Sequence, residues 1–309
     1  MDENERLIWF NGAIVKLSDA RISVLSPMAQ FGANVFEGIR CYWSGNESQL
    51  YAFRLQAHYN RLLNSIKLFR MDFDHDETFF KNALIDVVKA NMYKEDIAVR
   101  QTVFIDGDSG TWSSTGPVNM FISPIPKQRK TIPLNDGIRC HISSWLRIND
   151  NTLSPRMKCG ANYINSRLAQ QEALLCGYDS ALFLNNLGFI AEGPGSCIFI
   201  VKNGVLITPS LTDSILESIT RDTIIKLAEK ELHLTVQERS ITRTELYTCD
   251  EAFLCGSAAE VSPILEVDGM IIGDGQVGLL TKKLHSIYLK VVSGEYINYK
   301  NWLTPIYSL

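Results

Sequence analysis

The sequence predicts a protein of two domains in which helices and strands are mixed, a class between α/β and α+β. The chain has 309 residues, enough for two domains that each bury a core. Hydrophobic residues make up 46% of the chain and charged residues 21%, as in ordinary globular proteins. Segments with helical and strand periodicity follow one another irregularly, so a parallel sheet of repeated strand–helix–strand units is not expected.

The first predicted domain, residues 1–127, rests on hydrophobic periodicity. Apolar side chains recur at helical spacing in two segments, which predicts helices with one buried face. In a third segment they alternate, which predicts a strand. The expected elements are a hairpin through Asn11-Gly12, helices over residues 54–70 and 77–92, and strands over residues 97–105 and 118–123.

The predicted linker, residues 128–136, lies in a stretch of prolines and charged residues. The second predicted domain covers residues 137–309. Gly177 is expected to end its first helix. The expected elements are strands over residues 138–144, 234–238 and 252–255, helices over residues 163–176, 219–232 and 280–292, and hairpins through residues 185–188 and 203–204.

Composition and charge argue against several classes of function. The net charge is −4 and no run of Lys and Arg occurs, so a nucleic-acid surface is not expected. The apolar runs are far shorter than the roughly 20 residues of a membrane helix, and the acidic start is unlike a secretion signal. Seven cysteines contain no C-x-x-C pair, which is typical of reduced thiols in a cytoplasmic protein.

Motifs for nucleotide, metal and serine chemistry are weak or missing from the sequence. Residues 273–278 match G-x-G-x-x-G, but too little chain follows for a dinucleotide fold, so a turn is predicted. The five histidines have no spacing typical of metal ligands, and no metal is expected. No G-x-x-x-x-G-K-[ST] loop and no G-x-S-x-G elbow is present.

The stretch with the clearest chemical content is residues 156–163, Arg-Met-Lys-Cys-Gly-Ala-Asn-Tyr. It places Lys158 beside a small-residue turn where a helical pattern begins. A lysine amine attacks an aldehyde only when it is held in place and partly deprotonated, as in a partly dry pocket. Taken alone, a lysine in such a turn is far more often a solvated side chain.

Other stretches each allow a functional and a structural interpretation. Ser218 opens a helix, which is either a plain N-cap or an anion site made by free N–H groups. Residues 256–259, Gly-Ser-Ala-Ala, are either a packed turn or a set of N–H groups for an anion. Glu192 is either a solvated turn residue or a buried charge that needs a cation. Residues 31–40 are either a helix end leading into a strand or the floor of a pocket.

Together these stretches resemble the fold-type IV pyridoxal phosphate enzymes, and most closely the branched-chain aminotransferases. The resemblance runs from about residue 20 to 292 and keeps the family's order. The matching stretches are Val35-Phe-Glu-Gly-Ile-Arg40, Asn60-Arg61-Leu62, Ser143-Ser-Trp145, Lys158-Cys-Gly-Ala-Asn-Tyr163, Ala191-Glu-Gly193, Ile219-Thr-Arg-Asp222 and Gly256-Ser-Ala-Ala-Glu260.

The resemblance implies a fold like that of the D-amino acid aminotransferases. It has a small α/β domain and a larger, β-barrel-like domain with helices, with pyridoxal 5'-phosphate between them. It also implies a homodimer. The implied reaction moves the amino group of an L-amino acid to a 2-oxo acid such as 2-oxoglutarate by a ping-pong sequence.

Roles for single residues also follow from the resemblance. Lys158 is expected to hold the cofactor as an aldimine and to move the proton, and Glu192 to face the pyridine nitrogen. The other expected cofactor-binding residues are Tyr163 near the phenolic oxygen, and Arg61, Ile219, Thr220 and Ser257 at the phosphate. The expected substrate-binding residues are Phe36, Gly38, Arg100, Ser257 and Ala258.

The sequence departs from the family at three places. Many members have Tyr-x-Arg where this chain has Ala98-Val-Arg100, and Pro-Gly where it has Glu217-Ser218. A tryptophan common near the end of the small domain has no clear counterpart. Because these departures lie mainly on the substrate side, the expected donor is either a branched-chain-like or a more specialised L-amino acid. D-amino acid transaminases, aminodeoxychorismate lyases and a non-catalytic descendant of the fold are the alternatives.

Overall fold

The computed structural model describes residues 5–108, 110–130 and 137–307. Contacts divide the chain into two compact units. The first comprises Met1–Arg129, Met157–Ala161 and Val291–Leu309, and the second comprises Lys130–Arg156 and Asn162–Lys290. The predicted domain bounds stay a prediction, and most of the predicted linker, at 131–136, lies outside the described residues.

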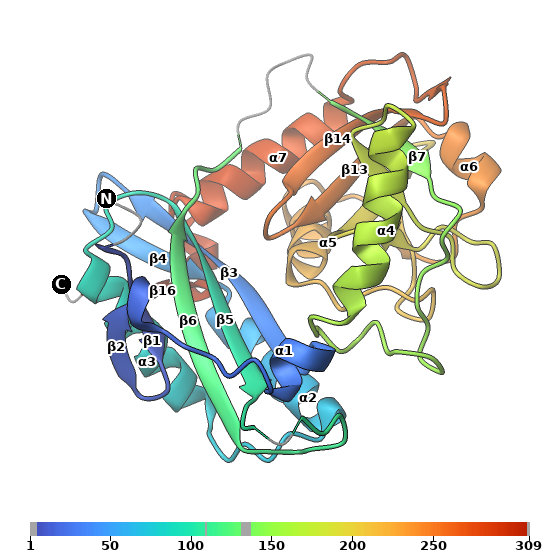
Figure 1. Ribbon diagram of the computed structural model, residues 1–309. Helices are drawn as coiled ribbons and strands as arrows, with labels where there is room; N and C mark the ends of the chain where they lie inside the picture. The colour runs from blue at the N-terminus through green and yellow to red at the C-terminus, as the bar shows by residue number, and fades with distance from the viewer. Residues whose placement is uncertain (1–4, 109, 131–136, 308–309) are drawn as a thin grey trace. The chain divides into compact units, whose positions relative to one another are not determined.

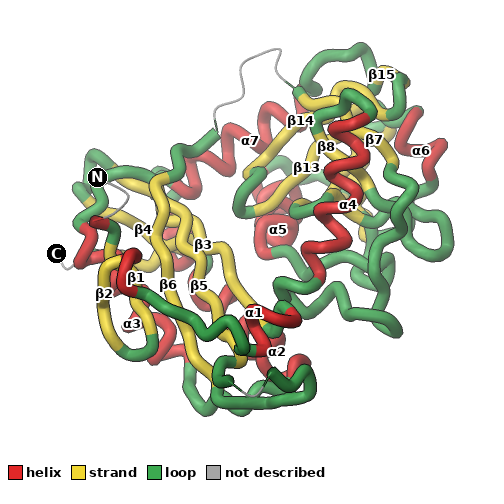
Figure 2. The backbone as a smooth tube through the Cα atoms, viewed as in Figure 1, coloured by secondary structure: helices red, strands yellow, loops and turns green. Residues whose placement is uncertain are grey.

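The first unit is built on a seven-stranded sheet in the order β16-β4-β3-β5-β6-β1-β2 (Figure 1). Each neighbouring pair in this order is antiparallel. Figure 2 shows the strands in yellow. Their bounds are β1 (Leu7–Phe10), β2 (Ala13–Lys16), β3 (Asn34–Ser44), β4 (Gln49–Phe53), β5 (Ile97–Ile105), β6 (Val118–Pro126) and β16 (Leu303–Pro305).

Two long helices of the first unit pack against this sheet, as their apolar faces predict. Helix α2 (Leu55–Phe69) packs on β3, and α3 (Glu77–Asn91) packs on β1 and β6. These confirm the helices predicted over residues 54–70 and 77–92, and the hairpin at Asn11-Gly12 is also confirmed. The shared core of helices and sheet includes Ile39, Leu62, Phe80, Leu84 and Val99, all fully buried.

Strand β6 is longer than predicted and runs through two prolines to Pro126. Proline lacks an N–H and is tolerated where a strand has no second neighbour. Strand β1 pairs with β6 only at Phe121 and Ile122, so the proline part of β6 pairs with β5 alone among the described strands.

The glycine- and aromatic-rich residues 31–40 begin at the end of a short helix and continue as a strand. Helix α1 (Pro27–Phe31) ends at Gly32, whose φ of 67° is easily adopted only by glycine. Strand β3 then starts at Asn34. The helix-to-strand interpretation of this stretch is therefore confirmed.

The second unit is built on a nine-stranded sheet whose main path is β12-β11-β10-β13-β14-β7-β8. Strand β15 adds to β14, and β9 adds to β10. The pairs β11–β12, β14–β7 and β7–β8 are parallel. The bounds are β7 (Ile138–Ile142), β8 (Ser180–Leu182), β9 (Glu192–Gly193), β10 (Ser196–Lys202), β11 (Val205–Thr208), β12 (Val236–Glu238), β13 (Glu251–Gly256), β14 (Glu260–Val267) and β15 (Met270–Ile271).

In the described part of the second unit, four helices accompany the sheet, and the three long ones were predicted. They are α4 (Asn162–Leu175), α5 (Ile219–Glu231), α6 (Arg243–Tyr247) and α7 (Leu279–Val292). Gly177 follows α4 with a φ of 80°, as expected of a helix-ending glycine. Residues 273–278 form the predicted turn, and the carboxylate of Glu251 accepts the N–H groups of Leu280 and Thr281 at the start of α7.

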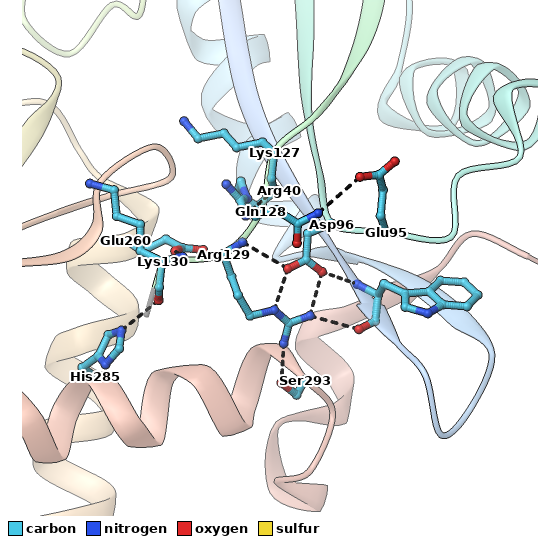
Figure 3. A network of polar contacts seen from close by, with 11 residues as sticks. Arg40, Glu95, Asp96, Lys127, Gln128, Arg129, Lys130, Glu260, His285 and Ser293 are labelled. Atoms are coloured by element: carbon cyan, nitrogen blue, oxygen red, sulfur yellow. Dashed lines mark hydrogen bonds and ion pairs between the residues drawn. The ribbon is translucent and has the colours of Figure 1, made fainter. Parts of the chain in front are cut away.

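Polar contacts fix the chain where it leaves the first unit and enters the second (Figure 3). In the first unit, Arg129 makes two bonds to the Asp96 carboxylate, at 2.5 and 2.6 Å, and its Nη1 donates to Ser293. In the second unit, the Lys130 N–H donates to Glu260 and its carbonyl lies 3.2 Å from His285 Nε2. Residues 129 and 130 are thus anchored, although both fall in the predicted linker.

Among the described residues, no helix combines the length and the apolar character needed to cross a bilayer.

Candidate active site

The peptide of Lys158 is held by a strand and a helix of the first unit. The Phe36 N–H donates to the Lys158 carbonyl at 2.9 Å, and the Gly160 N–H donates to the Asn34 carbonyl at 3.1 Å. The Lys158 N–H donates to Ser65 Oγ on α2 at 3.1 Å. Residues 158–160 therefore pair with the start of β3, which is remote from them in sequence, and the lysine backbone is fixed.

Gly160 lies close to the Asn34 side chain of β3. A Cβ atom at residue 160 would lie 2.7 Å from the side-chain amide of Asn34. A side chain at this position would require the Asn34 amide to move, and glycine leaves that amide its place beside the segment.

Phe36 brings two cations together in the first unit. The Lys158 Nζ lies 5.0 Å from the centre of the Phe36 ring, and the Arg100 guanidinium carbon lies 4.0 Å from it. Both distances are within the range of cation–π attraction. Gly38 lies opposite Arg100 in the pairing of β3 with β5. Four predicted site residues, Lys158, Phe36, Gly38 and Arg100, therefore lie near one another.

Arg61 lies on the buried face of α2 and is 8% exposed. Its guanidinium makes two hydrogen bonds of 2.7 Å to the Glu37 carboxylate on β3. His58 Nδ1 lies 2.6 Å from the same carboxylate. Burial by itself would raise the pKa of Glu37, but the charges of Arg61 and His58 and their hydrogen bonds hold it well below its usual range. Burial lowers the pKa of His58.

Three further residues of the first unit, Glu37, His58 and Ser65, were not predicted from the sequence to have a role. The spacing of His58, Arg61 and Ser65 places all three on one face of α2. Polar residues on a predicted apolar face are a signal that could have found them, because buried polar groups need partners.

In the second unit, Glu192 is a buried charge with a cationic partner, which decides between the two interpretations of its sequence. It is 3% exposed, and its Oε1 accepts a hydrogen bond from Arg147 Nε at 2.9 Å. Its Oε2 accepts the N–H of Leu216 at 3.2 Å and lies 3.6 Å from Cys197 Sγ. Arg147 compensates the carboxylate charge that burial would otherwise make unfavourable.

Both interpretations apply to the start of α5. It has an N-cap, and it has backbone N–H groups for which the helix itself offers no partner. Ser218 Oγ accepts the N–H of Arg221, as an N-cap does. An α-helix offers no partner of its own to the N–H groups of its first residues, here Ile219 and Thr220, so these can bind an anion. The preceding acid, Glu217, is ion-paired with Arg156 of the same unit, which offsets its charge beside this helix start.

The stretch with Ser257 and Ala258 is the turn between β13 and β14. Gly256 lies close to the loop between β9 and β10, since a Cβ at residue 256 would be 3.1 Å from the Gly195 carbonyl. Tyr163 is the second residue of α4 and is partly buried. The second unit thus carries Tyr163, Glu192, Ile219, Thr220, Ser257 and Ala258. The roles of these residues stay predictions.

The family model for amino-transferase class IV matches residues 34–267, most of the chain and nearly all of the stretches just described. The chain belongs to this family. Class IV aminotransferases are pyridoxal phosphate enzymes, so the resemblance stated from the sequence, its fold class and its cofactor are confirmed. The D-amino acid transaminase and lyase alternatives are not favoured.

The similarity to known aminotransferases extends over nearly the full length of this class IV aminotransferase. A probable branched-chain-amino-acid aminotransferase of Aquifex aeolicus is 40% identical, over 97% of this chain and 96% of its own. The branched-chain amino acid aminotransferase of Thermobaculum terrenum in its PLP form is 42% identical, with a TM-score of 0.93 over 99% of this chain and 100% of its own. The Thermoproteus uzoniensis branched-chain aminotransferase, solved with norvaline, is 40% identical, with a TM-score of 0.92 over 97% and 99%.

The residues of this aminotransferase fit pyridoxal phosphate chemically. The cofactor needs an amine for its aldehyde, a carboxylate for its ring nitrogen and donors for its phosphate. The first unit contains the Lys158 amine on a fixed backbone, and the second contains the buried Glu192 carboxylate and the N–H groups at the start of α5. Each required group is present.

Proposed function

We propose that this chain transfers the amino group of an aliphatic L-amino acid, branched-chain or similar, to a 2-oxo acid such as 2-oxoglutarate. The observation that carries the proposal is the fixed backbone of Lys158, which is held by both β3 and Ser65 while its amine lies over the Phe36 ring. A scaffold without catalysis needs no such arrangement. The full-length similarity to enzymes named branched-chain aminotransferases supports the same donor class.

Lys158, Tyr163, Glu192, Arg61, Ile219, Thr220 and Ser257 are the residues we propose to hold pyridoxal phosphate. When bound, the cofactor supplies an aldehyde that captures amines and a ring that takes up the electrons released at the substrate Cα. The negative charge of Glu192, compensated on its other side by Arg147, holds a proton on the ring nitrogen. Arg61 and the N–H groups of Ile219 and Thr220 bind the phosphate.

Lys158 Nζ is the group that moves the proton. A lysine amine can accept the proton of the substrate Cα and return it, provided that it is held at one place. The three hydrogen bonds that fix residues 158 and 160 limit its motion to the side chain. Restricting a reacting group in this way is a large part of what an active site contributes to the rate.

The substrate side is formed by Phe36, Gly38 and Arg100, with the N–H groups of Ser257 and Ala258 for the substrate carboxylate. Gly38 leaves room above β3, and Phe36 offers an apolar surface to an aliphatic side chain. Arg100 is suited to a second carboxylate, such as that of 2-oxoglutarate. Ala98 lies two residues before Arg100 on the same face of β5 and has no hydroxyl, so this side of the site is more apolar than in relatives with tyrosine.

We also propose a cytoplasmic homodimer. All seven cysteines are free thiols, which is typical of a reducing compartment. Helix α4 exposes Ile164, Leu168 and Leu175, at 62%, 39% and 88%, and such exposed apolar side chains favour burial against another chain.

A panel of amino donors tests this function. Purified protein with pyridoxal phosphate is incubated with L-amino acids, D-amino acids or aminodeoxychorismate, each with 2-oxoglutarate, and glutamate and pyruvate are measured. Glutamate from aliphatic L-amino acids, absent in Lys158→Ala, is expected. Glutamate only from D-amino acids, or pyruvate only from aminodeoxychorismate, would replace the proposal with the corresponding alternative.

A further inference from the structure

Glu37 and Arg61 form a buried ion pair with two contact points. Arg61 Nε donates to Glu37 Oε1 and Nη2 donates to Oε2, both at 2.7 Å. The Glu37 side chain is fully buried, and that of Arg61 is 9% exposed. Two parallel bonds between planar groups fix the plane and direction of a guanidinium as well as its position.

His58 adds a third member to this cluster. Its Nδ1 lies 2.6 Å from Glu37 Oε2, and it is 2% exposed. Because His58 and Arg61 stand three residues apart on α2 while Glu37 is on β3, the carboxylate joins the helix to the strand. The carboxylate that holds the guanidinium is therefore itself held by His58.

We propose that Glu37 is a positioning residue for Arg61 that holds the guanidinium in the orientation in which it binds the cofactor phosphate. The inference rests on the proposed function, in which Arg61 is a phosphate ligand. A guanidinium has five N–H donors in a fixed fork, and Glu37 takes two of them. The carboxylate thereby determines which edge of the guanidinium the phosphate meets.

An alternative role for Glu37 predicts the opposite change in phosphate affinity when the carboxylate is removed. If the carboxylate only neutralised Arg61, its negative charge would weaken phosphate binding, and removing it would tighten the complex. If it positions Arg61, removing it takes away the two bonds that set the plane of the guanidinium, and phosphate binding weakens. The direction of the change therefore distinguishes the two roles.

The experiment compares two ligands that differ only in the phosphate. Apparent dissociation constants of full-length protein freed of cofactor are measured for pyridoxal phosphate and for pyridoxal, by the absorbance of the bound aldehyde. For Glu37→Gln we expect affinity for pyridoxal phosphate to fall by about ten- to a hundredfold, by analogy with the loss of metal affinity when the hydrogen-bond partner of a metal-binding side chain is removed. Affinity for pyridoxal, which depends on Lys158, is expected to change by less than about twofold.

Two outcomes with Glu37→Gln overturn the positioning role. They are an unchanged ratio of the two affinities, and tighter binding of pyridoxal phosphate. Glu37→Asp is the second variant, since it keeps the charge but is too short to reach both Nε and Nη2, and the ratio is expected to fall here as well. If Glu37→Gln does not fold, an unchanged ratio in Glu37→Asp overturns the proposal.

Two control variants distinguish a failure of the role proposed for Glu37 from a failure of its premise, which is that Arg61 binds the phosphate. Asp96→Asn removes another buried carboxylate that holds an arginine by two bonds in the same unit, so it reproduces the loss of stability (Figure 3). In Asp96→Asn, the ratio of the affinities for pyridoxal phosphate and pyridoxal is expected to stay that of the wild type. Arg61→Lys tests the premise: an unchanged ratio there shows that Arg61 is no phosphate ligand, whereas a lowered ratio there with an unchanged one in Glu37→Gln rejects only the role of Glu37.

Discussion

Ser65 Oγ accepts a hydrogen bond from the backbone N–H of Lys158 at 3.1 Å, although 93 positions separate the two residues in sequence. Ser65 is fully buried on α2, on the same face as Arg61. One helix face therefore holds both the lysine backbone and the arginine proposed to bind phosphate. Under the proposed function, α2 positions two of the reacting and binding groups.

Ser65→Ala is expected to lower kcat by about ten- to a hundredfold, because a shift of the lysine by a fraction of an ångström misaligns the proton transfer. KM is expected to change little, since the substrate-side residues are untouched. Ser26→Ala is the matched control: Ser26 is also fully buried in the first unit, but it caps α1. A kcat loss of equal size in both variants would contradict the positioning of Lys158 by Ser65.

Arg147→Met is expected to destabilise the protein by about 3 kcal/mol or more, because it leaves Glu192 as an unpaired buried charge. The double variant Arg147→Met with Glu192→Gln is expected to recover most of this loss in urea unfolding, since the remaining side chain is neutral. Lys226→Met, which removes an exposed ion pair with Asp222 on α5, is expected to cost less than about 1 kcal/mol. Without recovery in the double variant, the loss comes from packing rather than charge.

The cluster of Glu37 and His58 predicts a loss of stability on acidification. The pKa of Glu37 is depressed in the folded state, so its contribution is present above its ordinary pKa of 4.5 and is lost as pH falls below that value. The pKa of His58 is also lowered, by burial, so below 6.5 the unfolded chain binds a proton that the folded protein does not, and stability falls there too.

Urea midpoints between about pH 8 and pH 4 measure this dependence. His58→Gln is expected to flatten the curve just below pH 6.5, and Glu37→Gln to flatten it below pH 4.5. A His58→Gln curve parallel to the wild type would show that His58 is not the group that titrates.

Arg156→Ala is expected to weaken pyridoxal phosphate binding by about two- to fivefold, because it leaves the charge of Glu217 uncompensated beside the start of α5. Glu217→Gln in the same background is expected to restore the affinity. Raising the salt concentration should shrink the difference, since both side chains are partly exposed. An Arg156→Ala protein with wild-type affinity would show that Glu217 has no influence on the phosphate.

Asp96→Asn is expected to lower the free energy of unfolding by about 3 kcal/mol, since Asp96 is 4% exposed, its carboxylate is bonded to Arg129 (Figure 3), and it also accepts the Trp43 N–H. Specific activity at saturating cofactor is expected to stay that of the wild type. Urea unfolding and a transamination assay on the same preparation measure the two effects. A loss of activity without a loss of stability would contradict this structural role.

Local patterns in the sequence were sufficient for most helices and hairpins. Helices α2, α3 and α5 follow apolar periodicity, and Asn11-Gly12 and Gly177 mark turns that favour positive φ. The family resemblance also came from short stretches, since an enzyme keeps the residue types that its chemistry needs. These features depend on neighbours a few positions away and can be read along the chain.

Pairings between distant segments could not be predicted in this way. The Lys158 segment pairs with β3, and β16 pairs with β4, but neither carries a local signal for its partner. Glu37 stood inside a recognised motif, yet only its distance to Arg61 showed what it holds. The sequence by itself determined most of the helices, the family and the lysine proposed to react. The tertiary structure alone decided which side chains hold that lysine and Arg61 in place, because such contacts depend on packing between segments that are remote along the chain.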